Sequence, residues 1–321
     1  DADGAPDGSF GTGGLASVPE LPFVTGVDTD AGDRVLLAGY GAGGFDVARL
    51  TETGVPDTGF SDDGVASAEF AGNERAHAVI AAPGGKVLAG GTGGGGILGP
   101  LALARFNADG TPDTSFSGDG KLTLDTPGRF GTVQALTIDP LGRIVAAGWL
   151  STCQTKDACP SYTMVWAVAR LTKKGKPDTT FGGGDGLVTL DVPGAGFDLG
   201  DAVAVDSQDR VILVGRAIAT VPTSVTRMGI VRFTAAGVPD PSFDGDGSLL
   251  ISFPGKANVG ASAVAIDGAG RIVVGGTASN GAEAEFAVAR VLENGGFDLG
   301  FGNAGRATLD FGTLPQEIMG D

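Results

Sequence analysis

A phrase built on aspartate, phenylalanine and glycine occurs six times in this chain. An aspartate stands three residues before each phenylalanine and glycines follow, as in Asp113-Thr-Ser-Phe116-Ser-Gly-Asp-Gly120. The phenylalanines lie at intervals of 50, 56, 65, 62 and 58 residues: Phe10, Phe60, Phe116, Phe181, Phe243 and Phe301. A period of this length is typical of repeat architectures, in which each unit buries its apolar face against its neighbours. We therefore expect one continuous domain over residues 1–321.

Each interval contains the same series of short apolar runs separated by turn residues. The run after the phenylalanine phrase resembles Leu187-Val-Thr-Leu-Asp191, and the second resembles Ala202-Val-Ala-Val-Asp206. A tight turn leads to a third run such as Arg210-Val-Ile-Leu-Val-Gly215, and a fourth resembles Ala167-Val-Ala-Arg-Leu171. Valine and isoleucine between turn residues are typical of strands. Four short strands per unit are therefore predicted.

Five such units, without helical periodicity, predict an all-β chain folded as a five-bladed β-propeller with four antiparallel strands per blade. Radial repetition of this kind limits exposed sheet edges. Residues 14–18 and 306–310 both have the pattern of an outermost strand, so six copies are present where five blades need five. We expect one terminal strand to close the ring. The other is expected to form an added edge strand, to be displaced, or to take part in a contact with another chain, as in self-assembly.

Two patterns recur through the chain, one as Asn107-Ala-Asp-Gly-Thr-Pro-Asp-Thr-Ser-Phe116 and the other as Asp139-Pro-Leu-Gly-Arg-Ile-Val-Ala-Ala-Gly148. Both resemble the bacterial delta-60 repeat family, a set of large surface or secreted proteins expected to be propellers. A weaker similarity links the strand 202–206 and its turn to propellers of the NHL type. The second unit departs from the pattern, because Ala82 stands where the others have aspartate. The resemblance implies a fold but no catalytic motif.

Charge and cysteine content restrict the classes of function. The chain has 21 Lys and Arg against 38 Asp and Glu, a formal net charge of −17. Such a surface repels phosphate backbones, so we expect no nucleic-acid partner. No apolar run approaches the ~18 residues of a membrane span. The sequence shows no leader, and a disulfide between Cys153 and Cys159 would indicate an oxidising compartment, although two free thiols are the alternative. We therefore expect a secreted or cell-surface protein.

Arginine recurs once per unit on the fourth strand. These arginines could form a positive ring that faces a ligand, or each could hold its own blade to the aspartate of the next phenylalanine phrase. The second interpretation is favoured, because the planar guanidinium suits two hydrogen bonds to one carboxylate and a ligand site usually breaks a repeat. The structural set is therefore Arg49, Arg105, Arg170, Arg232 and Arg290 with Asp57, Asp113, Asp178, Asp240 and Asp298.

Few residues suggest chemistry beyond the repeat. The ligand-binding candidates lie at the beginnings of second strands or beside the cysteine loop: Glu74, Arg75, His77, Asp201 and Trp149. Glycine-flanked aspartates such as Asp185, Asp244 and Asp246 resemble fragments of calcium loops, although the full ligand pattern is missing. Calcium at these turns is the one cofactor considered, and no metal-ligand set is assigned.

The absence of a catalytic constellation favours a binding or assembly module with a protein or glycan partner. The alternative is a lyase or hydrolase of polysaccharide or lactone type that acts at the mouth of the central channel. That alternative rests on Glu74, His77 and Asp201, because acid and base groups are needed for such chemistry.

Overall fold

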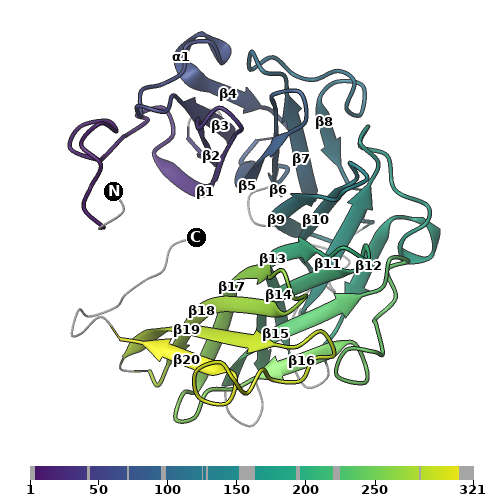
Figure 1. The fold of residues 1–321 in the computed structure, drawn as a ribbon. Helices are drawn as coiled ribbons and strands as arrows, with labels where there is room; N and C mark the ends of the chain where they lie inside the picture. The colour runs from purple at the N-terminus through teal and green to yellow at the C-terminus, as the bar shows by residue number, and fades with distance from the viewer. Residues whose placement is uncertain are drawn as a thin grey trace. The chain divides into compact units, whose positions relative to one another are not determined.

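A computed structural model describes residues 4–41, 44–70, 72–94, 99–124, 126–127, 129–151, 163–192, 196–219, 225–281 and 283–310. The chain divides into two compact units, Asp1–Leu136 with Lys173–Gly175, and Thr137–Thr172 with Lys176–Asp321. Almost all regular structure in the described residues is strand (Figure 1), and the helical pieces among them are α1 (Ser61–Gly64) and the 3-10 turn η2 (Gly182–Gly184). The prediction of an all-β chain is confirmed.

The first eight strands form two separate four-stranded antiparallel sheets, in the orders β1-β2-β3-β4 and β5-β6-β7-β8. Each sheet is a meander, because consecutive strands are neighbours. The strands are β1 (Phe23–Thr29), β2 (Val35–Tyr40), β3 (Phe45–Leu50), β4 (Val65–Ala68), β5 (Arg75–Ala82), β6 (Lys86–Thr92), β7 (Leu101–Phe106) and β8 (Lys121–Thr123).

The remaining strands form one twelve-stranded sheet made of three further meanders. Single parallel pairs, Met164 with Phe197 and Thr226 with Asn258, join one meander to the next. The strands are β9 (Gly131–Ile138), β10 (Ile144–Ser151), β11 (Met164–Leu171), β12 (Leu187–Leu190), β13 (Phe197–Val205), β14 (Val211–Ala219), β15 (Val225–Phe233), β16 (Ser248–Ile251), β17 (Asn258–Ile266), β18 (Ile272–Ser279), β19 (Ala284–Val291) and β20 (Arg306–Leu309).

Neighbouring meanders pack face to face and share one apolar core. In the first unit, Leu36 and Phe45 of one sheet lie in a cluster with Val79 and Phe106 of the next. In the second unit, residues of β14 and β15 share a cluster with residues of β17, β18 and β19. Sheets packed in series in this way are the arrangement of propeller blades. The fold is therefore propeller-like.

The sequence predicts an outermost strand near each end of the chain, at residues 14–18 and at residues 306–310. Residues 306–309 form β20, but residues 14–18 form no strand, and the prediction of a second terminal strand is wrong. An outermost strand pairs with the fourth-position strand of its own meander, as β4 pairs with β3. No strand precedes Phe10 within the described residues, so residues 14–18 lack that partner. A ring of five blades, its closure and a single domain over 1–321 stay predictions.

Candidate functional site

The recurring arginine and aspartate lie in contact in each of the five sequence repeats. In each pair the arginine Nε donates to the aspartate Oδ2, and the two residues stand eight apart in the sequence. The Nε–Oδ2 distances are 2.7 Å for Arg49–Asp57, 2.6 Å for Arg105–Asp113, and 2.8 Å for Arg170–Asp178, Arg232–Asp240 and Arg290–Asp298. Each guanidinium also lies 4.5–4.9 Å from the ring centroid of the following phenylalanine. The expected pairing of arginine with aspartate is therefore present in all five repeats, and a purely structural role for these residues stays a prediction.

A second cation, from the turn before the third strand, reaches the same aspartates. Arg143 contacts Asp178 over 3.4 Å and is itself held by Asp139, whose Oδ2 lies 2.6 Å from its Nε. In the second sequence repeat, Ala82 stands where the other repeats have the aspartate equivalent to Asp139. There the Lys86 Nζ lies 2.7 Å from Asp113 Oδ2. Burial alone would raise the pKa of Asp113, but hydrogen bonds from Lys86, Ser115 and Arg105 hold it well below its usual value.

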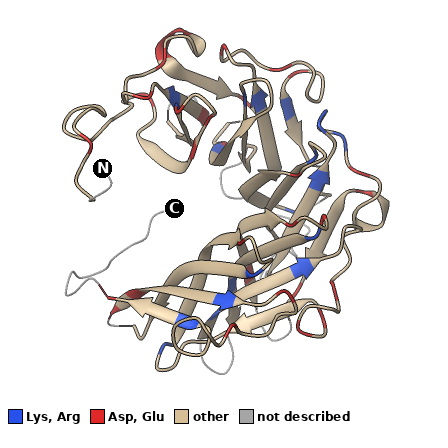
Figure 2. Cartoon of the chain, in the orientation of Figure 1, with Lys and Arg blue, Asp and Glu red and all other residues tan. Residues whose placement is uncertain are grey.

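In the described part of the chain, Lys and Arg lie mainly on strands, whereas Asp and Glu lie mainly in turns and loops (Figure 2). Some turn aspartates considered for calcium make the same local bond, in which Oδ1 accepts the backbone N–H two residues on, as from Leu187 to Asp185 and from Ser248 to Asp246. Burial and the neighbouring Asp246 raise the pKa of Asp244. Among the described residues no group of three or more His, Cys, Asp or Glu forms a metal site. Calcium at these turns stays a prediction.

The first strand of a meander carries a β-bulge at a fixed position in four of the repeats. The register shifts pass Thr25, His77, Asp201 and Ser262, all polar residues. Bulges re-aim a side chain and are frequent beside functional sites. His77 and Asp201, which the sequence singles out separately, therefore hold equivalent positions.

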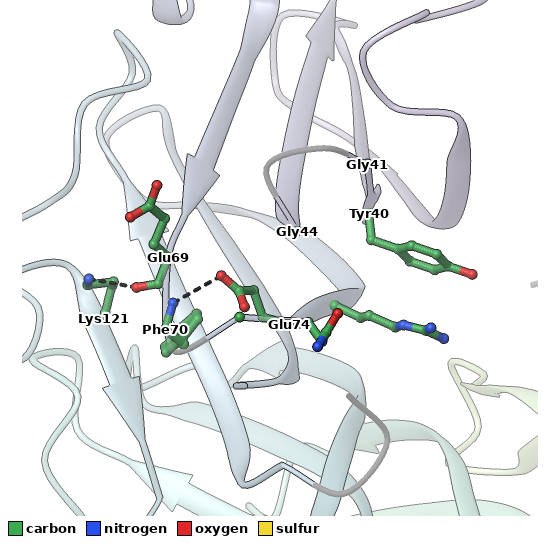
Figure 3. A pocket seen from close by; sticks show the side chains of 10 residues that line it. Tyr40, Gly41, Gly44, Glu69, Phe70, Glu74 and Lys121 are labelled. Carbon is green, nitrogen blue, oxygen red and sulfur yellow. Dashed lines mark hydrogen bonds between the residues drawn. The ribbon is translucent and has the colours of Figure 1, made fainter. Parts of the chain in front are cut away.

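A pocket of about 610 Å³ opens beside the beginning of β5 in the first unit. It is lined by Tyr40, Glu69, Phe70, Asn73, Glu74, Arg75, Lys121 and three glycines. Figure 3 shows Glu74 between Lys121 and Tyr40. The Arg75 guanidinium lies 4.5 Å from the Tyr40 ring centroid, and the Phe23 ring stacks on the same tyrosine at 4.9 Å. The lining thus combines two aromatic residues, two cationic residues and two acidic residues.

Glu74 is the most buried of the described residues that line the pocket. Its residue is 5% exposed, and Oε1 accepts the Phe70 backbone N–H over 3.2 Å. Its second oxygen, Oε2, is buried and has no hydrogen-bond partner. Gly44, at φ 90°, permits this close packing, because a Cβ there would lie 2.8 Å from Glu74 Cγ. A buried carboxylate oxygen without a partner is costly unless a ligand or water satisfies it.

The remaining candidates have separate surroundings. His77 lies on β5, and burial together with the charge of Arg75 lowers its pKa to about 4. Trp149 is 9% exposed on β10, so most of its ring is buried. Asp201 accepts two hydrogen bonds from Arg216, over 2.8 Å and 3.0 Å. Trp149 and Asp201 belong to the second unit and do not line the pocket of the first.

Sequence reasoning missed Tyr40, Glu69 and Lys121. A signal for Tyr40 is present, because Tyr40, Trp149 and Arg216 each follow the glycine near the end of a third-position run. No local pattern marks Lys121, which begins β8 and donates its Nζ proton to the Glu69 carbonyl over 2.8 Å. Cys153 and Cys159 lie outside the described residues.

Comparison with known families supports the repeat and the fold. Residues 83–116, 208–243 and 270–301 match the family model described as a domain of unknown function (DUF5122) beta-propeller. Each matched segment runs from the turn before the third-position strand to an anchor phenylalanine, so it includes one Arg–Asp pair. No curated protein matches the chain by sequence.

Several solved structures are similar at low identity. A gluconolactonase from Xanthomonas campestris is 14% identical with a TM-score of 0.41, covering 78% of this chain and 68% of its own. A virginiamycin B lyase from Staphylococcus aureus is 12% identical with a TM-score of 0.43, covering 95% and 88%. An ulvan lyase is 10% identical with a TM-score of 0.49, covering 86% and 69%. Similarity at this level does not indicate an activity.

No helix within the described ranges has the length and apolar character needed to cross a bilayer.

Proposed function

We propose that this chain is a binding module, secreted or displayed at a cell surface, that takes a glycan in the pocket of the first unit. The observation that carries the proposal is the pair formed by a buried, unpartnered Glu74 oxygen and the Tyr40 ring in one polar pocket. Neither feature occurs in every repeat, although Asp198 and Trp149 hold the positions of Glu74 and Tyr40 in a second pair of repeats. A ligand site requires a departure of this kind from the full repeat.

The chemistry of the lining suits a carbohydrate. Sugar hydroxyls donate to carboxylates and accept from guanidinium and ammonium groups, and aromatic rings pack against their C–H faces. Glu74 contributes an acidic residue to the lining, while Arg75 and Asn73 supply donors in the same pocket. A pocket of this size falls within the range of small-molecule sites.

The catalytic alternative has less support from the described contacts. Both carboxylate oxygens of Asp201 accept hydrogen bonds from Arg216, and Glu74 Oε1 accepts the Phe70 N–H. His77, with its pKa lowered to about 4, is a weak base and holds no proton to donate at neutral pH, so it is poorly suited to general acid or base catalysis. The non-catalytic role is therefore preferred.

Binding is tested with an array of neutral and uronate-containing oligosaccharides, followed by calorimetry on the best ligand. Glu74→Gln should weaken binding about tenfold, the loss of roughly 1.5 kcal/mol from one hydrogen bond to a charged group. Glu52→Gln, at an exposed glutamate in another turn, is the matched control and should leave affinity unchanged. No binding by the unaltered chain, or equal affinity for Glu74→Gln, would contradict the proposal.

A further inference from the structure

A second pocket, of about 410 Å³, is present in the second unit, to which all of the described residues that line it belong. Residues that follow β16 line one part of it, among them Phe253, Pro254 and Lys256, and residues 306–308 of β20 line another. A cavity of this volume falls within the range of small-molecule sites. The chain therefore has a second candidate ligand site, separate from the pocket of the first unit.

This pocket holds the same place in the repeat as the pocket of the first unit. Lys121, the first residue of β8, lines the first pocket, and Arg306, the first residue of β20, lines the second. Phe70 and Phe253 both stand two residues after the outermost strand of the preceding repeat. The first lining includes two acidic residues, whereas none of the described residues that line the second is acidic. The second pocket is therefore the more favourable of the two for an anion.

Arg306 has no acidic partner among the described residues. Its NH1 donates to the Ala304 carbonyl over 3.2 Å, its guanidinium lies 3.8 Å from the Phe297 ring centroid, and its Nε is buried without a hydrogen-bond partner. Recurring arginines such as Arg232 instead pair with an aspartate. A guanidinium is always charged, and a partly buried charge is costly without a counter-ion. Because Nε is buried, the terminal nitrogens are the atoms that can meet an anion in the pocket.

Lys256 adds a second cation, whose charge is already balanced. Its Nζ pairs with Glu285 of β19, and the two side chains are 13% and 18% exposed. Hydrogen bonds from Lys256 and Thr308 hold the pKa of Glu285 below its usual value, so its carboxylate is charged at neutral pH. The charge left at the pocket is then that of Arg306 alone. A single positive charge matches a carboxylate or a sulfate ester better than a phosphate ester, which carries about −2.

We propose that this pocket binds a monoanionic group, a carboxylate or a sulfate ester, through Arg306 and Lys256. The guanidinium supplies donors in a fixed plane, and the Lys256 ammonium has three donors, of which Glu285 takes one. Pro254 and Ala307 also line the pocket, so the body that carries the anion meets apolar surface there. With a formal net charge of −17, the chain as a whole repels extended polyanions, so the ligand is a small molecule with one such group.

Ligand-observed NMR on the full chain, at constant ionic strength, tests the site with three probes that share one apolar ring. Cyclohexanecarboxylate carries a carboxylate, cyclohexyl sulfate carries a sulfate ester, and cyclohexanecarboxamide is the neutral match. At least one of the two anions should bind saturably and the amide should not, and comparison of the anions shows which group the site prefers. In spectra of the arginine side chains, the bound anion should shift the Arg306 Nε signal, which Arg306→Lys identifies by its loss. Binding of all three probes alike, or of none, would overturn the proposal.

Variants test the charges of the pocket in turn. Arg306→Gln should weaken binding of the anion about tenfold, the loss expected when a hydrogen bond to a charged group is removed. Glu285→Gln leaves Lys256 without its counter-ion, so it should strengthen binding several-fold. Arg227→Gln is the matched control, because the Arg227 NH1 also donates to a carbonyl and Arg227 is not among the residues that line the pocket.

Two further variants separate this binding from loss of the fold and from the glycan proposal. Arg306→Lys keeps the charge and should retain most of the affinity, and circular dichroism melting identifies any variant that fails to fold. Glu74→Gln, in the pocket of the first unit, should leave binding of the anion unchanged. Equal affinities for Arg306→Gln and Arg227→Gln, or weaker binding by Glu285→Gln, would show that Arg306 and Lys256 do not hold the anion.

Discussion

Arg232 donates its Nε proton to Asp240 Oδ2 over 2.8 Å, and the arginine lies over the Phe243 ring at 4.9 Å. One side chain thereby connects a strand, the turn that follows it and the aromatic anchor of the next repeat. The Asp240 Oδ1 atom accepts the Ser242 N–H and hydroxyl, so both carboxylate oxygens are bonded. Burial opposes ionisation of this group, but these bonds and the charge of Arg232 lower its pKa.

Removing one partner of this buried pair should cost more than removing both. Arg232→Met leaves Asp240 buried without its main counter-ion, and we expect a loss of about 3–5 kcal/mol in the free energy of unfolding. The double variant Arg232→Met, Asp240→Asn should recover part of that loss. Urea denaturation of the four proteins in a double-mutant cycle measures the coupling.

The pair Arg290–Asp298 is the control, because Arg290 is more exposed than Arg232. Arg290→Met should cost only about 1 kcal/mol or less, since water screens exposed ion pairs. Equal losses for the two arginine variants would contradict the role of burial.

Substitution of two glycines in the same turn distinguishes the cost of backbone strain from the cost of a steric clash. Gly247 and Gly245 have φ values of 92° and 91°, but a Cβ on Gly247 would lie 2.7 Å from the Asp240 nitrogen, whereas nothing lies within 4 Å of one on Gly245. Gly245→Ala should cost about 1 kcal/mol from backbone conformation alone. Gly247→Ala should cost about 1–3 kcal/mol more. Denaturant midpoints measure the difference, and equal values would show that the contact relaxes.

The sequence predicts the meanders because strand pattern, turn residues and anchor repeat with one period. The pairing of Arg170 with Asp178 could be predicted from the sequence, because the spacing of eight residues recurs in every repeat. The contact of Arg143 with Asp178 could not, since these residues are 35 apart and meet only after two strands have paired. The pocket could be predicted only in part. Glu74 and Arg75 are neighbours in the sequence, but Tyr40 and Lys121 come from other strands.

His77 should remain neutral until the solution is markedly acidic. Burial and Arg75 lower its pKa to about 4, whereas an unfolded histidine titrates near 6.5. The unfolded chain therefore takes up a proton first, and the stability that His77 contributes is present above pH ~6.5 and is lost as the pH falls toward ~4. His77 is the only histidine, so its ring signals in an NMR titration report this pKa without assignment. A midpoint near the ordinary value would contradict the burial of the ring.

Asp198 should make the protein less stable as the pH rises. Asp198 stands three residues before the bulge of β13, as Glu74 stands three before the bulge of β5, and its residue is fully buried. Oδ2 accepts the Val192 N–H over 2.7 Å, whereas Oδ1 is buried without a partner. Burial raises the pKa of Asp198 to about 7, with a smaller effect from the charge of Asp191. The folded protein therefore keeps this proton after the unfolded chain has released it.

Stability should consequently fall between pH ~4 and pH ~7, by up to about 4 kcal/mol if the full shift is realised. Asp198→Asn removes the ionisation and keeps an acceptor for Val192, so it should match the unaltered protein near pH 4 and exceed it at pH 8. Asp246→Asn is the control, because its aspartate is exposed and bonded to Ser248. The measurement is urea denaturation of the three proteins across this pH range. If the curves for Asp198→Asn and the unaltered protein run parallel, Asp198 ionises without cost and its burial does not govern the pH dependence.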